Sequence, residues 1–274
     1  MKRIFGILMI FACMQLAAQT TAEQYRARYT RLVGSVGADG VGVEHLLKNW
    51  GKDFPDDCAM LQGKYYYYYL KSRSEAIEAV DAQKFLGSKP VLSLKDSTGR
   101  DVNYFTVPKF DDELFRESQV SIDKAIELKP MELRYRFDKI SALADYEKDS
   151  PDMAATAMLD LIDLDARTHP EWTLDGEPVS RGDFEDAVQE YCLLFYTIGS
   201  PNSYESFRTL AERMLKINPK STVFLNDIGA YWQVAKRNDK TAAKFYRKTL
   251  KIDPEDSAAK TNLAIIERNK KKKK

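Results

Sequence analysis

VFLNDIGAYWQVAKRNDKTAAKFYRKTLKIDPED, residues 223–256, decides the fold expected for this chain. Apolar residues in its first half recur at steps of three and four, which places them on one face of a helix. Arg237, Asn238 and Asp239 then interrupt the pattern, and the Asp239 carboxylate can accept the free backbone N–H groups that begin a second helix. Pro254 prevents that helix from continuing. The stretch therefore predicts two amphipathic helices joined by a tight polar turn.

Small residues alternate with large ones along these two helices, so the backbones can approach closely at Gly229 and Ala242. The spacing resembles that of the tetratricopeptide repeat, which places a large residue, Leu-Gly, an aromatic, Ala, a second aromatic, Ala and Pro at fixed intervals. The residues that carry the resemblance are Leu225, Ile228, Gly229, Trp232, Ala242, Tyr246, Thr249 and Pro254. This chain departs from the family by one extra residue in the turn and by Thr249 in place of Ala.

The ending of this repeat recurs along the chain. NWGKDFP, AIELKP, MLKINP and TLKIDP each close an apolar helix with a proline, at Pro55, Pro130, Pro219 and Pro254. The last interval matches one repeat, whereas the earlier intervals are far longer and indicate insertions. The resemblance is clear over residues 204–268 and looser before them. It implies a mainly all-α fold in which helical hairpins form a right-handed solenoid over residues 19–269.

Two insertions are expected within this repeat domain. In residues 90–108, two β-prone runs flank a loop that contains glycine, which predicts a β-hairpin packed on the helices. Residues 169–182 contain Trp172, Gly176 and Pro178, and are expected to form a loop or a short ordered turn. The helices expected around the insertions span about 23–55 (a pair with its turn at 34–42), 57–86, 111–129, 131–147, 151–165, 183–198, 203–217 and 257–269.

The charge balance excludes a strong electrostatic attraction to nucleic acid or to a membrane. The 274 residues include 42 Lys and Arg against 41 Asp and Glu, a formal net charge of +1. Lys2, Arg3 and the lysine tail at 270–274 are basic, so the body between them is mildly acidic. The tail is expected to be a solvated end, with contact to an anionic lipid, polysaccharide or nucleic acid as the alternative.

The N-terminus has the pattern of a secretory signal peptide, in which basic residues precede a short apolar run and small residues. We expect cleavage after Ala18 and export to the periplasm or cell envelope, with Cys13 as a lipoprotein lipidation site in the alternative interpretation. No other stretch is long and apolar enough to span a membrane. Cys58 and Cys192 could pair in an oxidising compartment, but two buried thiols are favoured.

The inventory of reactive residues does not favour an enzyme. His45 and His169 are the two histidines, and neither lies near a cysteine or a spaced pair of carboxylates that would indicate a metal site. No nucleophile motif is present. We therefore expect no catalytic residue, no metal site and no cofactor.

LQGKYYYYYL, residues 61–70, is the stretch most suggestive of a binding surface. Five consecutive tyrosines cover more than one helical turn, so they cannot all face the core. Counting from the closing prolines places Gln62, Tyr66 and Tyr69 on one exposed face, and Asn226 and Gln233 on the same side of the last repeat. The alternative is that two or three tyrosines pack between repeats and the others are incidental surface aromatics.

The resemblance implies a binding function, because the first helices of successive tetratricopeptide repeats line a concave groove that receives peptides. We expect an exported scaffold that holds a protein or peptide partner through Gln62, Tyr66, Tyr69, Asn226 and Gln233. A glycan-binding or glycan-handling module of the cell envelope is the alternative, because tyrosine also stacks on sugar rings. Neither interpretation requires nucleic acid or a membrane-spanning segment.

Overall fold

The structure is a computed structural model that describes residues 21–272. The chain divides into two compact units, one formed by residues 21–73 and 111–130 and the other by residues 74–110 and 131–272. Both are mainly helical, and small antiparallel sheets supply the rest, which confirms the expectation of a mainly α fold. The expected signal peptide at 1–18, including Cys13, lies outside the described residues.

The first unit contains four helices. They are α2 (Ala22–Val36), α3 (Val43–Asp53), α4 (Cys58–Ser72) and α5 (Asp112–Leu128). A capping box at Thr21 and Gln24 begins α2, because each side chain accepts the backbone N–H of the other residue. Trp50 of α3 is fully buried and stacks on Tyr25 of α2, with ring centroids 5.9 Å apart. Helix α4 packs against both α3 and α5.

The prediction of one helix over 57–86 is wrong in its second half. Helix α4 ends at Ser72, and Arg73–Val80 forms strand β1. The Ala- and Glu-rich sequence of β1 has a high helix propensity, but the strand hydrogen-bonds to β3 (Asp101–Phe110) at the edge of a sheet. Tertiary pairing therefore overrides local preference. The Asp111 N–H donates to the Ser72 carbonyl at 2.8 Å, so the two ends of the inserted segment, residues 73–110, meet.

The β-hairpin expected at 90–108 is confirmed and belongs to a three-stranded sheet in the order β1-β3-β2. Strand β2 (Leu92–Lys95) pairs antiparallel with β3, with Leu92 opposite Tyr104 and Lys95 opposite Asp101. One face of β3 is buried, and the Phe85 ring packs on the edge of Phe105 with centroids 5.9 Å apart. The sheet thus packs on its own connecting loop as well as on helix α6.

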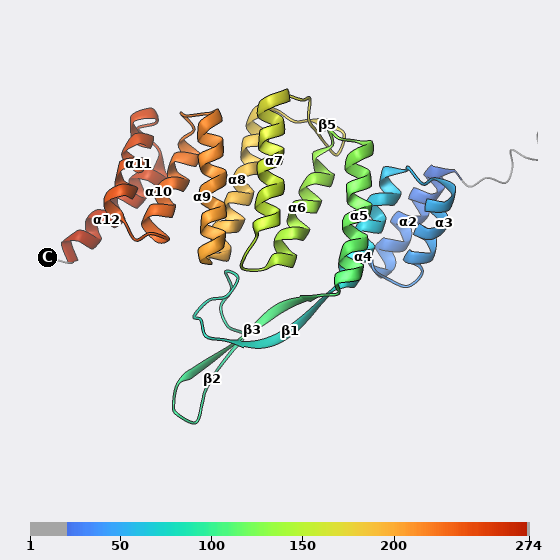
Figure 1. Cartoon of the computed structure of the whole chain (residues 1–274), viewed down its shortest axis with the longest axis horizontal. Coiled ribbons are helices and arrows are strands. Elements are labelled where there is room, and N and C mark those ends of the chain that lie inside the picture. Colours follow the sequence, from blue (N-terminus) through green and yellow to red (C-terminus); the bar gives the residue numbers. More distant parts are fainter. Residues whose placement is uncertain (1–20, 273–274) are drawn as a thin grey trace, which may run out of the picture. The chain divides into compact units, whose positions relative to one another are not determined.

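The second unit contains seven helices, which stand side by side in Figure 1. They are α6 (Leu133–Glu147), α7 (Asp152–Thr168), α8 (Arg181–Ile198), α9 (Pro201–Ile217), α10 (Thr222–Val234), α11 (Asp239–Ile252) and α12 (Ser257–Lys272). Helices α6, α8 and α10 each pack against the helix that follows. Further contacts join α7 to α9, α9 to α10, and α11 to α12. The helices expected from the sequence agree with these bounds to within a few residues.

The two helices of residues 223–256 pack as their sequence indicates. Ala242, Tyr246 and Thr249 of α11 are fully buried, and Trp232 of α10 packs half-buried against the same cluster. One detail of the prediction is wrong, because Asn238 caps α11 instead of Asp239. The Asn238 side chain accepts the Thr241 N–H, and Asp239 becomes the first helical residue.

The second insertion, at 169–182, is a short ordered turn, as expected. It contains the two-residue strands β4 (Thr173–Leu174) and β5 (Glu177–Pro178), paired antiparallel. Two buried carboxylates anchor it. Glu132 accepts the backbone N–H groups of Asp175 and Gly176, and Asp165 accepts the Trp172 indole N–H at 3.1 Å.

The remaining structural expectations concern the cysteines and the membrane. Cys58 and Cys192 are both buried free thiols, the interpretation favoured by the sequence. Among residues 21–272, no helix is long and apolar enough to cross a membrane.

Candidate functional site

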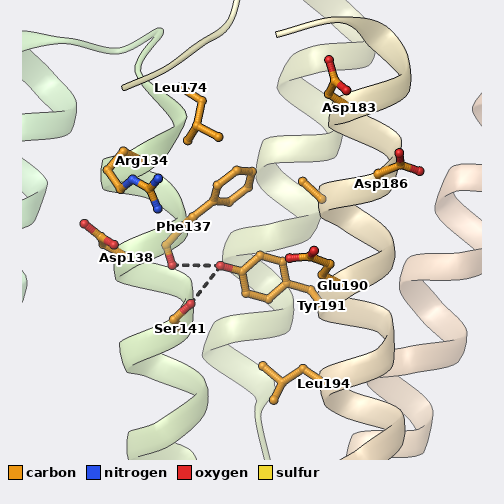
Figure 2. Close-up of a pocket in the computed structure, with 11 residues that line it drawn as sticks. Arg134, Phe137, Asp138, Ser141, Leu174, Asp183, Asp186, Glu190, Tyr191 and Leu194 are labelled. Carbon is orange, nitrogen blue, oxygen red and sulfur yellow. Dashed lines mark hydrogen bonds between the residues drawn. The ribbon is translucent and has the colours of Figure 1, made fainter. Parts of the chain in front are cut away.

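The α6–α8 cleft is an open cavity of about 540 Å³ in the second unit, lined mainly by these two helices. Arg134, Phe137, Asp138 and Ser141 recur at helical spacing and form one stripe of α6. The facing stripe of α8 starts at Asp183 and ends at Leu194, and Leu174 of β4 contributes from the insertion. Figure 2 shows the two stripes facing each other. The complete lining is Arg134, Phe137, Asp138, Ser141, Leu174, Asp183, Asp186, Ala187, Glu190, Tyr191 and Leu194.

Tyr191 forms the floor of the α6–α8 cleft and joins its two walls (Figure 2). Its hydroxyl donates to the Phe137 carbonyl at 2.9 Å and hydrogen-bonds to the Ser141 hydroxyl at 2.9 Å. Burial raises the pKa of Tyr191 to about 12, so the phenol remains neutral. The ring also lies 5.7 Å from that of Phe137, measured between centroids. Contacts within the protein therefore hold the aromatic floor of the cleft in place.

The rim of the α6–α8 cleft is acidic. Asp138, Asp183, Asp186 and Glu190 line it together with a single basic residue, Arg134. The Arg134 guanidinium already pairs with Asp175 of the insertion, which is outside the cleft lining. The surface thus combines apolar contact area with net negative charge. Such a surface favours a partner with apolar and basic side chains.

The insertion at 169–182 shapes one end of this cleft. Glu132 caps α6 by accepting the Arg134 N–H, and the same carboxylate holds the turn between β4 and β5. This anchoring places Leu174 over the cleft and Asp175 beside Arg134. A segment that interrupts the helical pattern therefore completes the site.

The tyrosine-rich site residues predicted in α4 lie in the first unit. Tyr65 and Tyr67 are buried, whereas Gln62, Tyr66 and Tyr69 are half-buried. Tyr69 stacks on Tyr65 with ring centroids 5.8 Å apart. The pattern of alternating burial agrees with packing of some tyrosines between helices. Partner binding by Gln62, Tyr66 and Tyr69 stays a prediction.

The two site residues predicted in α10 make hydrogen bonds within the second unit. The Asn226 amide donates to both carboxylate oxygens of Asp256, at 3.0 and 3.1 Å, and Asp256 in turn accepts the Ala259 N–H at the start of α12. The Gln233 carbonyl accepts the Tyr246 hydroxyl at 2.8 Å. Asn226 therefore supports the end of a neighbouring helix. Gln233 lines a separate cavity together with Asp227, and this cavity is called the Asp227 pocket.

Neither His45 nor His169 is among the residues that line the α6–α8 cleft. His45 is exposed on α3 beside Asn49, and His169 is the exposed C-cap of α7. Within residues 21–272, no group of three or more His, Cys, Asp or Glu residues is arranged to hold a metal ion.

Sequence reasoning did not identify the α6–α8 cleft. Its α8 residues are spaced as on any amphipathic helix, and the sequence places Asp183 only at the start of a helix. The available signal was the stripe of Asp186, Glu190 and Leu194, which mixes acidic and apolar side chains on one face. No protein-family model matches the chain, and no curated protein is similar enough to be matched.

Proposed function

We propose that the second unit is an interaction scaffold that holds an extended protein or peptide segment against α6, α8, α10 and α12. The α6–α8 cleft is the observation that carries this proposal. It offers an apolar and aromatic floor with an acidic rim, the combination by which a groove binds a peptide carrying apolar and basic side chains.

The pairing of the helices supports the same proposal. In the tetratricopeptide-like interpretation, α6–α7, α8–α9 and α10–α11 are three successive repeats of a right-handed solenoid, and α12 closes the array. Helices α6, α8, α10 and α12 are then the equivalent first helices. The cleft lies between two of them, where the family's groove is expected, and the exposed leucines of α8 lie beside it.

The proposal includes no catalytic step, and export to the cell envelope remains part of it. The glycan-binding alternative is suggested by the tyrosines and the β-hairpin. The tyrosines lend it little support, since none of Tyr65, Tyr66, Tyr67, Tyr68 and Tyr69 is exposed.

Selection of peptides from a random display library on the full chain tests the proposed function. Selected peptides should share apolar and basic residues. A double variant of the chain, Asp186→Lys with Glu190→Lys, should weaken their binding at least tenfold, as measured by calorimetry. Asp160→Lys is the matched control, because Asp160 is exposed on α7 and does not line the cleft. Equal affinity for the double variant and the control would refute the cleft as the binding site.

A further inference from the structure

A second cavity of about 390 Å³, the Asp227 pocket, has a buried carboxylate in its lining. Asp227 is on α10 and is only 7% exposed. The Gln189 amide donates to its Oδ1 at 3.1 Å, but its Oδ2 is buried with no hydrogen-bond partner. The Oε1 of Gln189 is likewise buried and unpartnered. One buried acceptor atom on α8 and one on α10 therefore lack donors.

An unpaired buried carboxylate is costly for a folded protein, because the charged form loses its hydration. Of the charged or titratable groups around Asp227, Cys192 and Tyr196 come from α8 and Tyr246 from α11. None of these three is a cation. The residues that line the pocket therefore supply no positive charge, so Asp227 is either protonated or paired with a cation from outside them.

The walls of the Asp227 pocket are suited to an alkyl chain. Leu193, Tyr196, Val234 and Ile265 supply apolar surface around the carboxylate. Gln233, Tyr246 and Asn262 add a few polar atoms, and the Tyr246 hydroxyl oxygen can still accept a hydrogen bond after donating to Gln233. A ligand that fits has an apolar stem and a cationic end with several N–H donors. The lysine side chain has this chemistry, with three donors on its ammonium group.

The Asp227 pocket and the α6–α8 cleft adjoin each other on helix α8. Leu194 lines the cleft and Leu193 lines the pocket, and these neighbours are 38% and 50% exposed. Along α8, the cleft stripe passes through Asp186 and Glu190, and the pocket stripe through Leu193 and Tyr196. A segment that lies in the acidic cleft can therefore reach the pocket by crossing one ridge of exposed leucine.

We propose that the Asp227 pocket receives the ammonium group of a lysine side chain carried by the peptide segment that the α6–α8 cleft holds. This inference rests on the proposed function and names the chemistry of its partner. The lysine stem lies along Leu193 and Ile265, and its ammonium pairs with the Asp227 carboxylate. Rotation about the Cβ–Cγ bond of Asp227, a broad torsion, brings a carboxylate oxygen to the cation.

Methyl-labelled NMR of the full chain, titrated with n-butylammonium chloride, tests the pocket directly. The probe has the alkyl stem and charge of lysine. Methyl signals of Leu193, Val234 and Ile265 report on the pocket, while those of Leu174 and Leu194 report on the cleft. Saturable shifts are expected at the pocket reporters. Asp227→Asn should weaken binding at least tenfold, as should replacing the probe with n-butanol. Equal binding to Asp227→Asn, or shifts confined to Leu174 and Leu194, would overturn the proposal.

A second measurement uses the peptides selected on the cleft and keeps the two proposals apart. Replacing a peptide lysine by norleucine, which retains the stem without the charge, should lower affinity at least tenfold for the wild-type chain and have little effect for Asp227→Asn. If the peptides bind the cleft without any dependence on lysine, the pocket proposal is wrong and the proposed function stands. If no peptide shifts Leu174 or Leu194, the proposed function fails, while the butylammonium result still decides the pocket.

Discussion

Gly229 of α10 lies directly against the ring of Tyr246 of α11. A Cβ atom at position 229 would lie 2.5 Å from Cε1 of Tyr246, closer than non-bonded atoms can approach. Tyr246 is fully buried and its hydroxyl donates to Gln233, so the ring would have to shift against this packing to make room. The small residue therefore sets how closely the two helices approach.

Gly229→Ala should lower the free energy of unfolding of the second unit by about 1–3 kcal/mol, the usual cost of overpacking a core. In an open helical position the same change would raise stability. Urea denaturation measures the difference. Gly182→Ala on α8 is the control, since the nearest atom to its added Cβ is 3.7 Å away, and it should leave stability unchanged or slightly raised. Equal effects of the two changes would contradict the close contact.

Asp227→Asn should change how stability depends on pH. Burial, only partly offset by the Gln189 hydrogen bond, raises the pKa of Asp227 to about 7. The folded state therefore holds a proton that the unfolded state releases near pH 4, and stability falls as pH rises from about 4 to 7. The loss is on the order of 4 kcal/mol, because each pKa unit between the unfolded and folded values corresponds to about 1.4 kcal/mol.

The Asp227→Asn variant should lack this loss. The difference between its free energy of unfolding and that of the wild type should therefore grow from pH 4 to pH 8. Burial raises the pKa of Cys192, Tyr196 and Tyr246, so none of these neighbours titrates in that window. Chemical denaturation at several pH values measures the slope of the free energy of unfolding against pH. Asp186→Asn, at an exposed carboxylate, should retain the wild-type slope. Parallel curves for wild type and Asp227→Asn would show that Asp227 is charged throughout.

Glu132→Gln should loosen the insertion at 169–182. Both carboxylate oxygens accept hydrogen bonds, and an amide would turn an NH₂ group toward the N–H of Asp175 or Gly176. The expected cost is about 1–3 kcal/mol, shared between this turn and the start of α6, which Glu132 also caps. Hydrogen exchange of the Asp175 and Gly176 amides should accelerate tenfold or more. Glu171→Gln, at an exposed position of the same insertion, should leave both rates unchanged.

Asn226→Asp should destabilise helix α12. The Asn226 amide supports the Asp256 carboxylate, which caps this helix, and a second carboxylate would repel it. Amide exchange along α12 should accelerate, with the largest change in its first turn. Asn238→Asp is the matched control, because Asp caps the start of α11 as well as Asn does. Unchanged exchange in α12 would mean that the Asn226 bond does not hold the cap.

The sequence predicts best where the information is local. The helical hairpin of residues 223–256 can be predicted from its apolar periodicity and its small residues, because both signals lie within the helices themselves. The inserted β-hairpin also follows from local signals at its Gly-containing loop. Strand β1 could not be predicted in this way, because its pairing with β3 is a contact between segments far apart in the sequence.

The candidate site was less predictable for the same reason. Asn226 faces α12 through a partner thirty positions along the chain, so its amide could not be assigned from its own helix. The α6–α8 cleft needs Tyr191 to reach the backbone of Phe137, and needs Glu132 to hold the insertion in place. These contacts join residues that are far apart in the sequence, so the sequence shows the side chains but does not predict the contacts between them.

The hydrogen bond from the Asp111 N–H to the Ser72 carbonyl has a consequence for synthesis of the chain. Helices α4 and α5 pack together, yet residues 74–110, which lie between them in the sequence, belong to the other compact unit. On the ribosome, the first unit therefore lacks its last helix until α5 follows the inserted segment out of the exit tunnel. The inserted segment adds little to the entropy cost of bringing α4 and α5 together, because this cost rises only slowly with loop length. The delay leaves the buried face of α4 open to the surroundings of the nascent chain until α5 covers it, and exposed apolar surface of this kind promotes aggregation.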